Sequence, residues 1–173
     1  MLTSFDQVLA RAKERASARV AVCAAQDREV LEAVKMAVDI GMGEFTLVGD
    51  ARRITELGSS VGLDLSGVVV MDEPDAAKAA RLAVGLVSAG EAGILMKGLV
   101  PTADFLRAVL DREVGLRTGK LLSHVAVFRS PRYDRFFYLT DGAMVVAPTL
   151  EEKVQIIENA VGVAHGLGNE TPK

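Results

Sequence analysis

Apolar residues occur in short runs along the first hundred positions, and between the runs they recur every three or four residues. The runs have strand length and are almost uninterrupted, which is typical of parallel strands buried on both faces. The segments between them have the period of helices with one apolar side. The predicted strands are 19–24, 44–48, 67–71 and 93–96, and the predicted helices are 5–18, 28–41, 51–61, 76–89 and 102–114.

Each predicted helix follows a residue, or begins with one, whose side-chain oxygen can accept a hydrogen bond from a free N–H group of the first turn. These predicted capping residues are Ser4, Asp27, Asp50, Asp75 and Thr102. The regular alternation of strand and helix predicts an α/β fold, with a parallel sheet covered by helices on both faces.

The pattern changes after residue 117. Two apolar segments, 123–128 and 136–140, have no helical segment between them, so they predict an antiparallel hairpin. A long helix is predicted at 150–165, where Thr149 and Glu152 form a capping-box pattern. We therefore expect an α/β domain at 1–117 and the start of a second domain at 118–173. The turn-like residues 168–173 suggest the front part of a longer protein.

Composition narrows the class of protein. The chain has 173 residues, of which 50% are hydrophobic and 25% charged, as in a soluble globular protein. The net charge of −3 provides no cationic field for nucleic acid or an anionic membrane. Cys23 is the single cysteine, so no internal disulfide can form. No segment has the length of a membrane span, and the N-terminus lacks a signal-peptide layout, so we expect a cytoplasmic protein.

The joint between the fourth strand and the next helix carries the first candidate site. Lys97 and Gly98 follow the strand, Thr102 stands where the helix begins, and Arg107 lies further along it. Ligands of open parallel sheets bind beyond the carboxyl ends of the strands, where helix N-termini favour anions. The four residues would suit phosphate or another oxyanion. In the alternative interpretation, Thr102 only caps the helix and Arg107 is a solvated surface residue.

Three further positions each have two interpretations. The basic, glycine-containing turn at 117–120, with Arg117 and Lys120, is either an anion contact or a solvated interdomain loop. His124 either faces a cleft or is a satisfied core histidine. Asp141 either orients a cation or substrate hydroxyl, or serves the turn after its strand. The sequence contains no P-loop, and two histidines with one cysteine argue against a zinc site, so no metal is expected.

Longer motifs make a resemblance specific. The stretches "LMKGLVPTADFLRAVLDREVGLRTGKLLSHVAVF", "YDRFFYLTDGAMVVAP" and "EEKVQIIENAVGVAHGLG" resemble the front half of the phosphate acetyl/butyryltransferase family, the butyryl branch in particular. The resemblance implies acyl transfer between coenzyme A and phosphate. It also implies a fold like that of isocitrate and isopropylmalate dehydrogenases, with two α/β domains and an active site between them.

The resemblance also implies site residues, with Thr102 and Arg107 in catalytic roles. The implied substrate-binding residues are Lys97, Gly98, Arg117, Lys120, Ser123, His124 and Asp141. Coenzyme A is then a substrate and not a tightly bound cofactor, the partners are acyl-CoA and phosphate or acyl phosphate, and the protein is a homo-oligomer. One position departs from the family pattern, because butyryl-branch members often have asparagine where this chain has Val145.

Two other functions stay open. A dehydrogenase of the isopropylmalate type would share the fold, but it would need an acidic metal-binding cluster and arginines that bind a hydroxy acid. A non-catalytic module would bind phosphate or coenzyme A, or act only by assembling.

Overall fold

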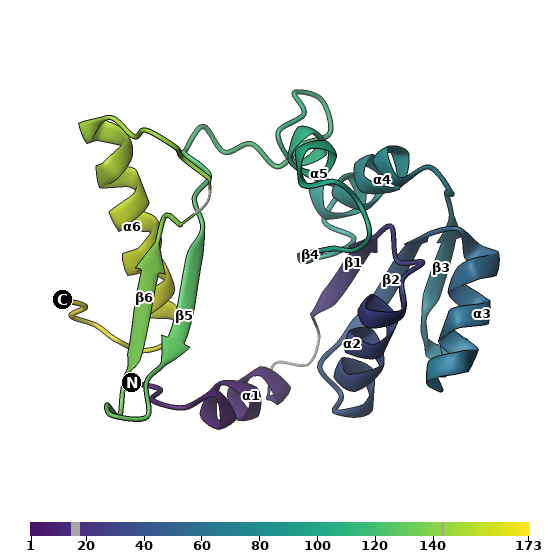
Figure 1. Ribbon diagram of the computed structural model, residues 1–173, viewed down its shortest axis with the longest axis horizontal. Coiled ribbons are helices and arrows are strands. Elements are labelled where there is room, and N and C mark those ends of the chain that lie inside the picture. The colour runs from purple at the N-terminus through teal and green to yellow at the C-terminus, as the bar shows by residue number, and fades with distance from the viewer. Residues whose placement is uncertain (15–17, 143) are drawn as a thin grey trace. The chain divides into compact units, whose positions relative to one another are not determined.

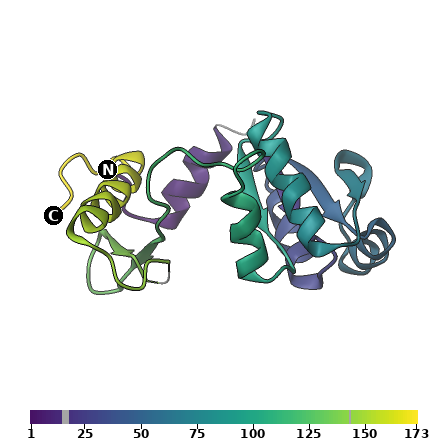
Figure 2. The ribbon, with the colours of Figure 1, turned by 90° about the horizontal axis from the view of Figure 1, so that it is seen from above.

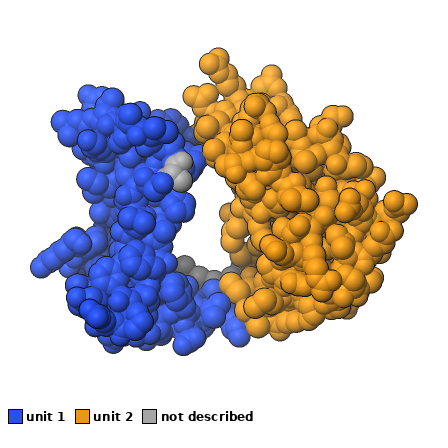
Figure 3. All heavy atoms as spheres, viewed as in Figure 1, with its two compact units in different colours: residues 1–14, 118–173 blue, residues 15–117 orange. Residues whose placement is uncertain are grey.

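The chain divides into two compact units (Figure 3). The computed structural model describes residues 1–14, 18–142 and 144–173. One unit, Arg15–Arg117, is called the α/β unit here. The other, called the hairpin unit, joins Met1–Glu14 to Thr118–Lys173.

The N-terminal helix α1 (Phe5–Lys13) therefore belongs with the hairpin unit, whereas the sequence-based division assigned it to residues 1–117. The ring of Phe5 packs on that of Phe136, with 5.0 Å between the centroids. The backbone N–H of Leu2 donates to the carbonyl oxygen of Leu167 at 2.9 Å. These contacts join residues more than a hundred positions apart, which local sequence patterns do not reveal.

The α/β unit contains a four-stranded parallel sheet (Figure 1). Its strands are β1 (Arg19–Cys23), β2 (Glu44–Gly49), β3 (Val69–Asp72) and β4 (Ile94–Lys97). Their order is β3-β2-β1-β4, so Val22 of β1 stands beside Leu47 on one side and Met96 on the other. Strands β2 and β3 are added in sequence on one side of β1, and β4 then pairs with β1 on its other side. The carboxyl ends of β1 and β4 are thus the point at which ligands of such sheets bind.

Helices cover both faces of this sheet, as the alternating pattern predicted. They are α2 (Arg28–Asp39), α3 (Ala51–Val61), α4 (Ala76–Ser88) and α5 (Thr102–Val109). Val20 and Val22 of β1 pack in one core with α2 and α3, while Ala21 and Cys23 pack in another with α4 and α5. Figure 2 shows α4 and α5 side by side. Small alanines on α4 let it approach the sheet closely.

The hairpin unit confirms the predicted antiparallel pair. Strands β5 (Val125–Arg129) and β6 (Phe136–Thr140) pair so that Val127 stands opposite Tyr138. Helix α6 (Leu150–Gly166) packs against both strands. It begins with the predicted capping box, in which the Thr149 hydroxyl accepts from Glu152 N and the Glu152 carboxylate accepts from Thr149 N.

Most predicted helix starts are confirmed, since the side chains of Ser4, Asp27, Asp50 and Asp75 all accept a hydrogen bond from the first turn. Helix α1 is shorter than predicted. It stops at Lys13, and residues 15–17 of the predicted helix lie outside the described part of the chain. The third strand begins later than predicted because a 3-10 turn, Leu65–Gly67, precedes it.

Helix α5 ends at Val109, five residues before the predicted end. The Asp111 carboxylate accepts hydrogen bonds from the backbone N–H groups of Glu113 and Val114, at 2.9 and 3.0 Å, and so bends the chain into a turn. Gly115 follows in this turn. A residue with a side chain would clash there, because its Cβ would lie 2.7 Å from the carbonyl oxygen of Val109. In the described residues, no helix has the length and apolar character needed to cross a membrane.

Candidate functional site

Gly98 follows β4 directly and is buried against the end of β1. Its N–H donates to the carbonyl oxygen of Cys23 at 2.9 Å, and Leu99 N donates to that of Ala24 at the same distance. A Cβ on Gly98 would lie 2.5 Å from the Ala24 oxygen and would also overlap the Cys23 oxygen. The glycine therefore allows close approach to the protein's own backbone.

Lys97, the last residue of β4, is exposed. Its ammonium group donates to the carbonyl oxygen of Gly98 at 3.3 Å, which is a weak bond on the adjacent residue. The structure shows no carboxylate within salt-bridge distance of it among the described residues. The charge is thus available to an anion at the carboxyl edge of the sheet.

Thr102 does not cap helix α5, which corrects the sequence-based assignment. Pro101 occupies the cap position, with no side-chain hydrogen bond to the first turn, and Thr102 is the first helical residue. The chain is extended at Pro101, and the helix follows at once. The Thr102 side chain is exposed, and its hydroxyl is not used in a cap.

Arg107 is exposed in the last turn of α5, with 73% of its side chain accessible. Its guanidinium contacts the carboxylate of Asp104, in the first turn of the same helix. The side chain thus reaches back toward the helix N-terminus, as long helical side chains prefer. Asp104 supplies a competing anion, so a bound phosphate would have to share or displace it.

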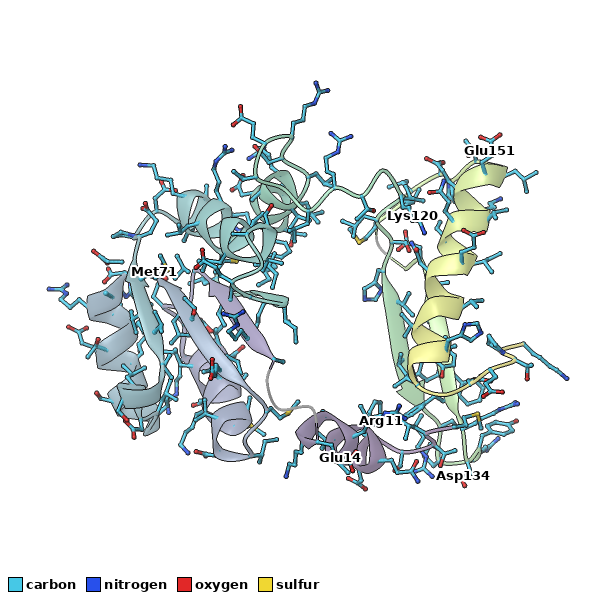
Figure 4. All side chains as sticks on the ribbon, turned by 180° about the vertical axis from the view of Figure 1, so that it is seen from behind. Arg11, Glu14, Met71, Lys120, Asp134 and Glu151 are labelled. Carbon is cyan, nitrogen blue, oxygen red and sulfur yellow. The ribbon has the colours of Figure 1, made fainter. Side chains whose placement is uncertain are left out.

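Arg117 and Lys120 are both exposed, and they fall in different units. The turn that holds Lys120 is fixed by Gly119, whose φ of +80° favours glycine, and by a 3.4 Å bond from Lys120 N to the Thr118 hydroxyl. Lys120 lies at the end of the hairpin unit where Glu151 and the start of α6 lie (Figure 4). Whether these two cations bind an anion stays a prediction.

His124 is exposed, so the interpretation as a core histidine is wrong. Its backbone is held on both sides by the end of β6. The N–H of His124 donates to Asp141 Oδ1 at 2.8 Å, and its carbonyl oxygen accepts from the Thr140 hydroxyl at 2.7 Å. Thr140 and Asp141 at the end of β6 therefore fix the backbone of His124.

Asp141 stabilises the turn that follows β6, which was one of its two interpretations. The other carboxylate oxygen, Oδ2, accepts from Met144 N at 3.3 Å and Val145 N at 2.6 Å. The N–H of His124 is the largest cause that lowers the pKa of the Asp141 carboxyl, and the N–H groups of Val145 and Met144 act in the same direction. The bonds at position 145 use the backbone, so the valine there does not disturb them.

Ser123 is half-buried beside helix α6. The side-chain amide of Asn159 donates to the Ser123 hydroxyl at 2.9 Å and to the carbonyl oxygen of Leu121 at 3.0 Å. The side chain of Gln155 accepts from Leu121 N at 2.9 Å. Asn159 and Gln155 were not among the predicted site residues, because only the fold places one face of α6 against residues 121–123.

A shallow groove of about 360 Å³ lies at the carboxyl edge of the sheet, where the strand order reverses. Its apolar wall comes from α2, β4 and the turn after β4, and Asp27 and Glu29 add carboxylates. The lining residues are Asp27, Glu29, Val30, Ala33, Met96, Gly98 and Leu99. Sequence reasoning missed this groove because strand order, which brings α2 beside β4, was not predicted. Its carboxylates oppose an oxyanion and suit a group with an apolar body and N–H donors.

Cys23 is fully buried at the end of β1, and burial raises the pKa of its thiol, which disfavours a reactive thiolate there. Within the described ranges, no three residues among His, Cys, Asp and Glu are grouped so that they could hold a metal ion.

The chain is similar to known proteins over its whole length. A family described as "Phosphate acetyl/butaryl transferase" matches residues 4–80 and 75–173. Phosphate butyryltransferases from Clostridium acetobutylicum and Clostridium beijerinckii are 47% and 50% identical over all 173 residues. The chain spans only 58% and 57% of the lengths of those two proteins.

The fold is similar to that of a solved structure. A branched-chain phosphotransacylase from Enterococcus faecalis V583 superimposes with a TM-score of 0.75 at 31% identity. The match covers 87% of this chain and 52% of that one.

Proposed function

The chain belongs to the phosphate acetyl/butyryl transferase family, and on this premise we propose that the protein in which it occurs transfers a short-chain acyl group, of butyryl type, between coenzyme A and phosphate. The observation that carries the proposal is the identity of 47% and 50% to two phosphate butyryltransferases, over every residue of the chain. Acyl-CoA and phosphate are its substrates in one direction, and acyl phosphate and coenzyme A in the other.

The chemistry needs cations and hydrogen-bond donors. When the thiolate of coenzyme A attacks the carbonyl carbon of an acyl phosphate, a C–S bond forms, negative charge develops on the carbonyl oxygen, and the C–O bond to phosphate then breaks. Three exposed side chains are proposed to stabilise the carbonyl oxygen and the departing phosphate. They are the cations Lys97 and Arg107 and the hydroxyl of Thr102, which forms no capping bond. Thr102 is supported in this role because no capping bond occupies its oxygen.

A second set of residues is proposed to bind the substrates. It consists of Gly98, Arg117, Lys120, Ser123, His124 and Asp141. Asp141 acts through the backbone of His124, to which it is hydrogen-bonded, and Gly98 acts by letting the turn that follows Lys97 pack against β1. Arg117 and Lys120 offer exposed charges for the phosphates of coenzyme A.

A thiol-release assay tests the proposal. The complete encoded protein is given butyryl-CoA and inorganic phosphate, and free coenzyme A is measured with 5,5′-dithiobis(2-nitrobenzoic acid). We expect thiol release that requires phosphate, and faster release with butyryl-CoA than with acetyl-CoA. Absence of phosphate-dependent release with every short-chain acyl-CoA would overturn the proposal, and faster release with acetyl-CoA would overturn only the butyryl preference.

Three further statements remain predictions of the proposal. The protein forms homo-oligomers, which sedimentation analysis tests. It resides in the cytoplasm, which fractionation of the source cells tests. Its complete fold resembles that of isocitrate and isopropylmalate dehydrogenases, which a structure of the whole protein tests.

A further inference from the structure

Residues 121–124 lead into β5 and are held from two sides. Helix α6 holds its beginning, through Gln155 and Asn159, and the end of β6 holds the backbone of His124. All these bonds lie within the hairpin unit. The segment carries Ser123, whose hydroxyl is therefore fixed in place by a helix that sequence patterns did not connect with it.

The hydrogen-bond pattern at Asn159 determines the polarity of the Ser123 hydroxyl. The carbonyl oxygen of Leu121 can only accept, so the atom of Asn159 that contacts it at 3.0 Å must be the amide nitrogen. The same nitrogen lies 2.9 Å from the Ser123 oxygen, and its second hydrogen points there. Ser123 is thus the acceptor in this bond.

The proton of Ser123 must then point away from Asn159. Within residues 1–14, 18–142 and 144–173, the structure shows no acceptor for this proton. A half-buried hydroxyl whose proton has no partner is ready to donate. The groups that accept most strongly are anionic oxygens, among them those of phosphate.

We infer that Asn159 is a positioning residue that directs the Ser123 proton outward, so that Ser123 donates a hydrogen bond to a phosphate oxygen of a substrate. The inference rests on the proposed function, which supplies two such groups. One is inorganic phosphate or the acyl phosphate made from it, and the other is a phosphate of coenzyme A. The chemistry is the same for both, and kinetics with each substrate varied in turn distinguishes them.

The main test compares two substitutions on α6 in the complete encoded protein. Asn159→Asp places a carboxylate where the amide was, and this group would accept the Ser123 proton and turn the hydroxyl inward. We expect the KM for phosphate or for butyryl-CoA to rise about 10-fold, since a hydrogen bond to a charged group contributes roughly that much, while kcat changes little. The melting temperature should fall, because the carboxylate cannot donate to the Leu121 carbonyl oxygen. Gln155→Ala loosens the segment by removing the bond to Leu121 N but does not turn the Ser123 proton, so both KM values should rise clearly less than in Asn159→Asp.

A double-mutant cycle separates proton direction from simple repulsion. Ser123→Ala should by itself raise the same KM about 10-fold, because the donor is lost. In the Ser123→Ala background, Asn159→Asp should then add less than about twofold, because no proton remains to be redirected. Repulsion between the new carboxylate and phosphate would instead persist in that background.

Each outcome has a defined meaning. A rise in the KM for phosphate alone, or for butyryl-CoA alone, supports the inference and identifies the phosphate that is bound. Unchanged KM values in Asn159→Asp overturn it, as do equal effects of Asn159→Asp and Gln155→Ala, which would show a tethering role only. An additive cycle also overturns it. If the unaltered protein releases no thiol, the proposed function fails, and that result is distinct from all of these.

Discussion

The backbone at the end of β1 leaves no room for a side chain at Gly98. This predicts how much stability a single added methyl group would remove. Gly98→Ala should lower the free energy of unfolding by about 3 kcal/mol, because the new Cβ would overlap the carbonyl oxygens of Cys23 and Ala24, which belong to a buried strand end that cannot easily shift. Urea denaturation of the chain measures this change.

Gly85 provides the matched control for that substitution. It lies in the interior of α4 in the same unit, and a Cβ there meets no atom within 4 Å. Gly85→Ala should raise the free energy of unfolding by about 0.5–1 kcal/mol, since alanine favours helices more than glycine does. If both substitutions have the same sign, the contact of Gly98 with β1 is not as described.

The carboxylate of Asp141 predicts a dependence of stability on pH. Its pKa is lowered in the folded protein, chiefly by the N–H of His124, so it stabilises the fold above the unfolded pKa of about 4 and loses this effect as pH falls through the folded pKa. Asp141→Asn should therefore lower the melting temperature at pH 7, and the difference from the unaltered protein should shrink toward pH 3. A difference that is constant across this range contradicts the role of the charge.

At the scale of residues, the sequence motifs selected candidate side chains but did not show which atoms they contact. Lys97, Gly98, Ser123 and Asp141 were selected from motifs, but the partner of Gly98 lies on another strand. The partner of Asp141 lies 17 residues earlier in the chain. Such roles depend on which backbone atoms the fold brings near, and a single sequence does not contain that information.

Elements were predicted well where their signals are local. Apolar runs and caps placed the starts of α2, α3 and α6 correctly, because a capping side chain bonds to the backbone within three residues. Helix α5 was predicted too long. Its end depends on Asp111, whose carboxylate binds the backbone of the turn, and the apolar pattern continues past that point.

Two threonines at helix starts should differ in their contribution to stability. Thr149→Ala should lower the free energy of unfolding by about 1 kcal/mol, because it removes the oxygen that accepts from Glu152 N. Thr102→Ala should change it by less than about 0.5 kcal/mol, because Thr102 is exposed and forms no cap. Urea denaturation of both variants measures the difference, and an equal loss would show that Thr102 caps α5 after all.

At the scale of the whole molecule, the class of fold was predictable, but the order of its strands and the placement of α1 were not. The alternation of strand and helix is enough to indicate a parallel sheet with two helical layers. The order β3-β2-β1-β4 depends on which strands pair, and so does the groove beside α2. The placement of α1 with the hairpin unit rests on contacts such as Phe5 with Phe136, between residues far apart in the sequence.

The role of Arg107 is a question for the whole protein, because the chain spans only 58% and 57% of the lengths of the two phosphate butyryltransferases that it matches. In the complete encoded protein, Arg107→Ala should lower kcat/KM for phosphate about 100-fold, since removal of one donor aimed at the charge that develops in the transition state costs roughly 3 kcal/mol. Arg107→Lys should restore only part of the activity, because an ammonium group cannot form the two parallel hydrogen bonds of a guanidinium.

The matched control is Arg52, an exposed helical arginine of the same unit whose side chain lies near Glu56, at 3.8 Å. Arg107 resembles it in exposure and in its carboxylate neighbour, Asp104, so loss of a surface ion pair alone should affect both variants alike. Arg52→Ala should keep kcat/KM within about twofold, and both variants should keep their melting temperatures. Equal, near-normal activity of the two variants would show that Arg107 is a solvated surface residue, paired only with Asp104.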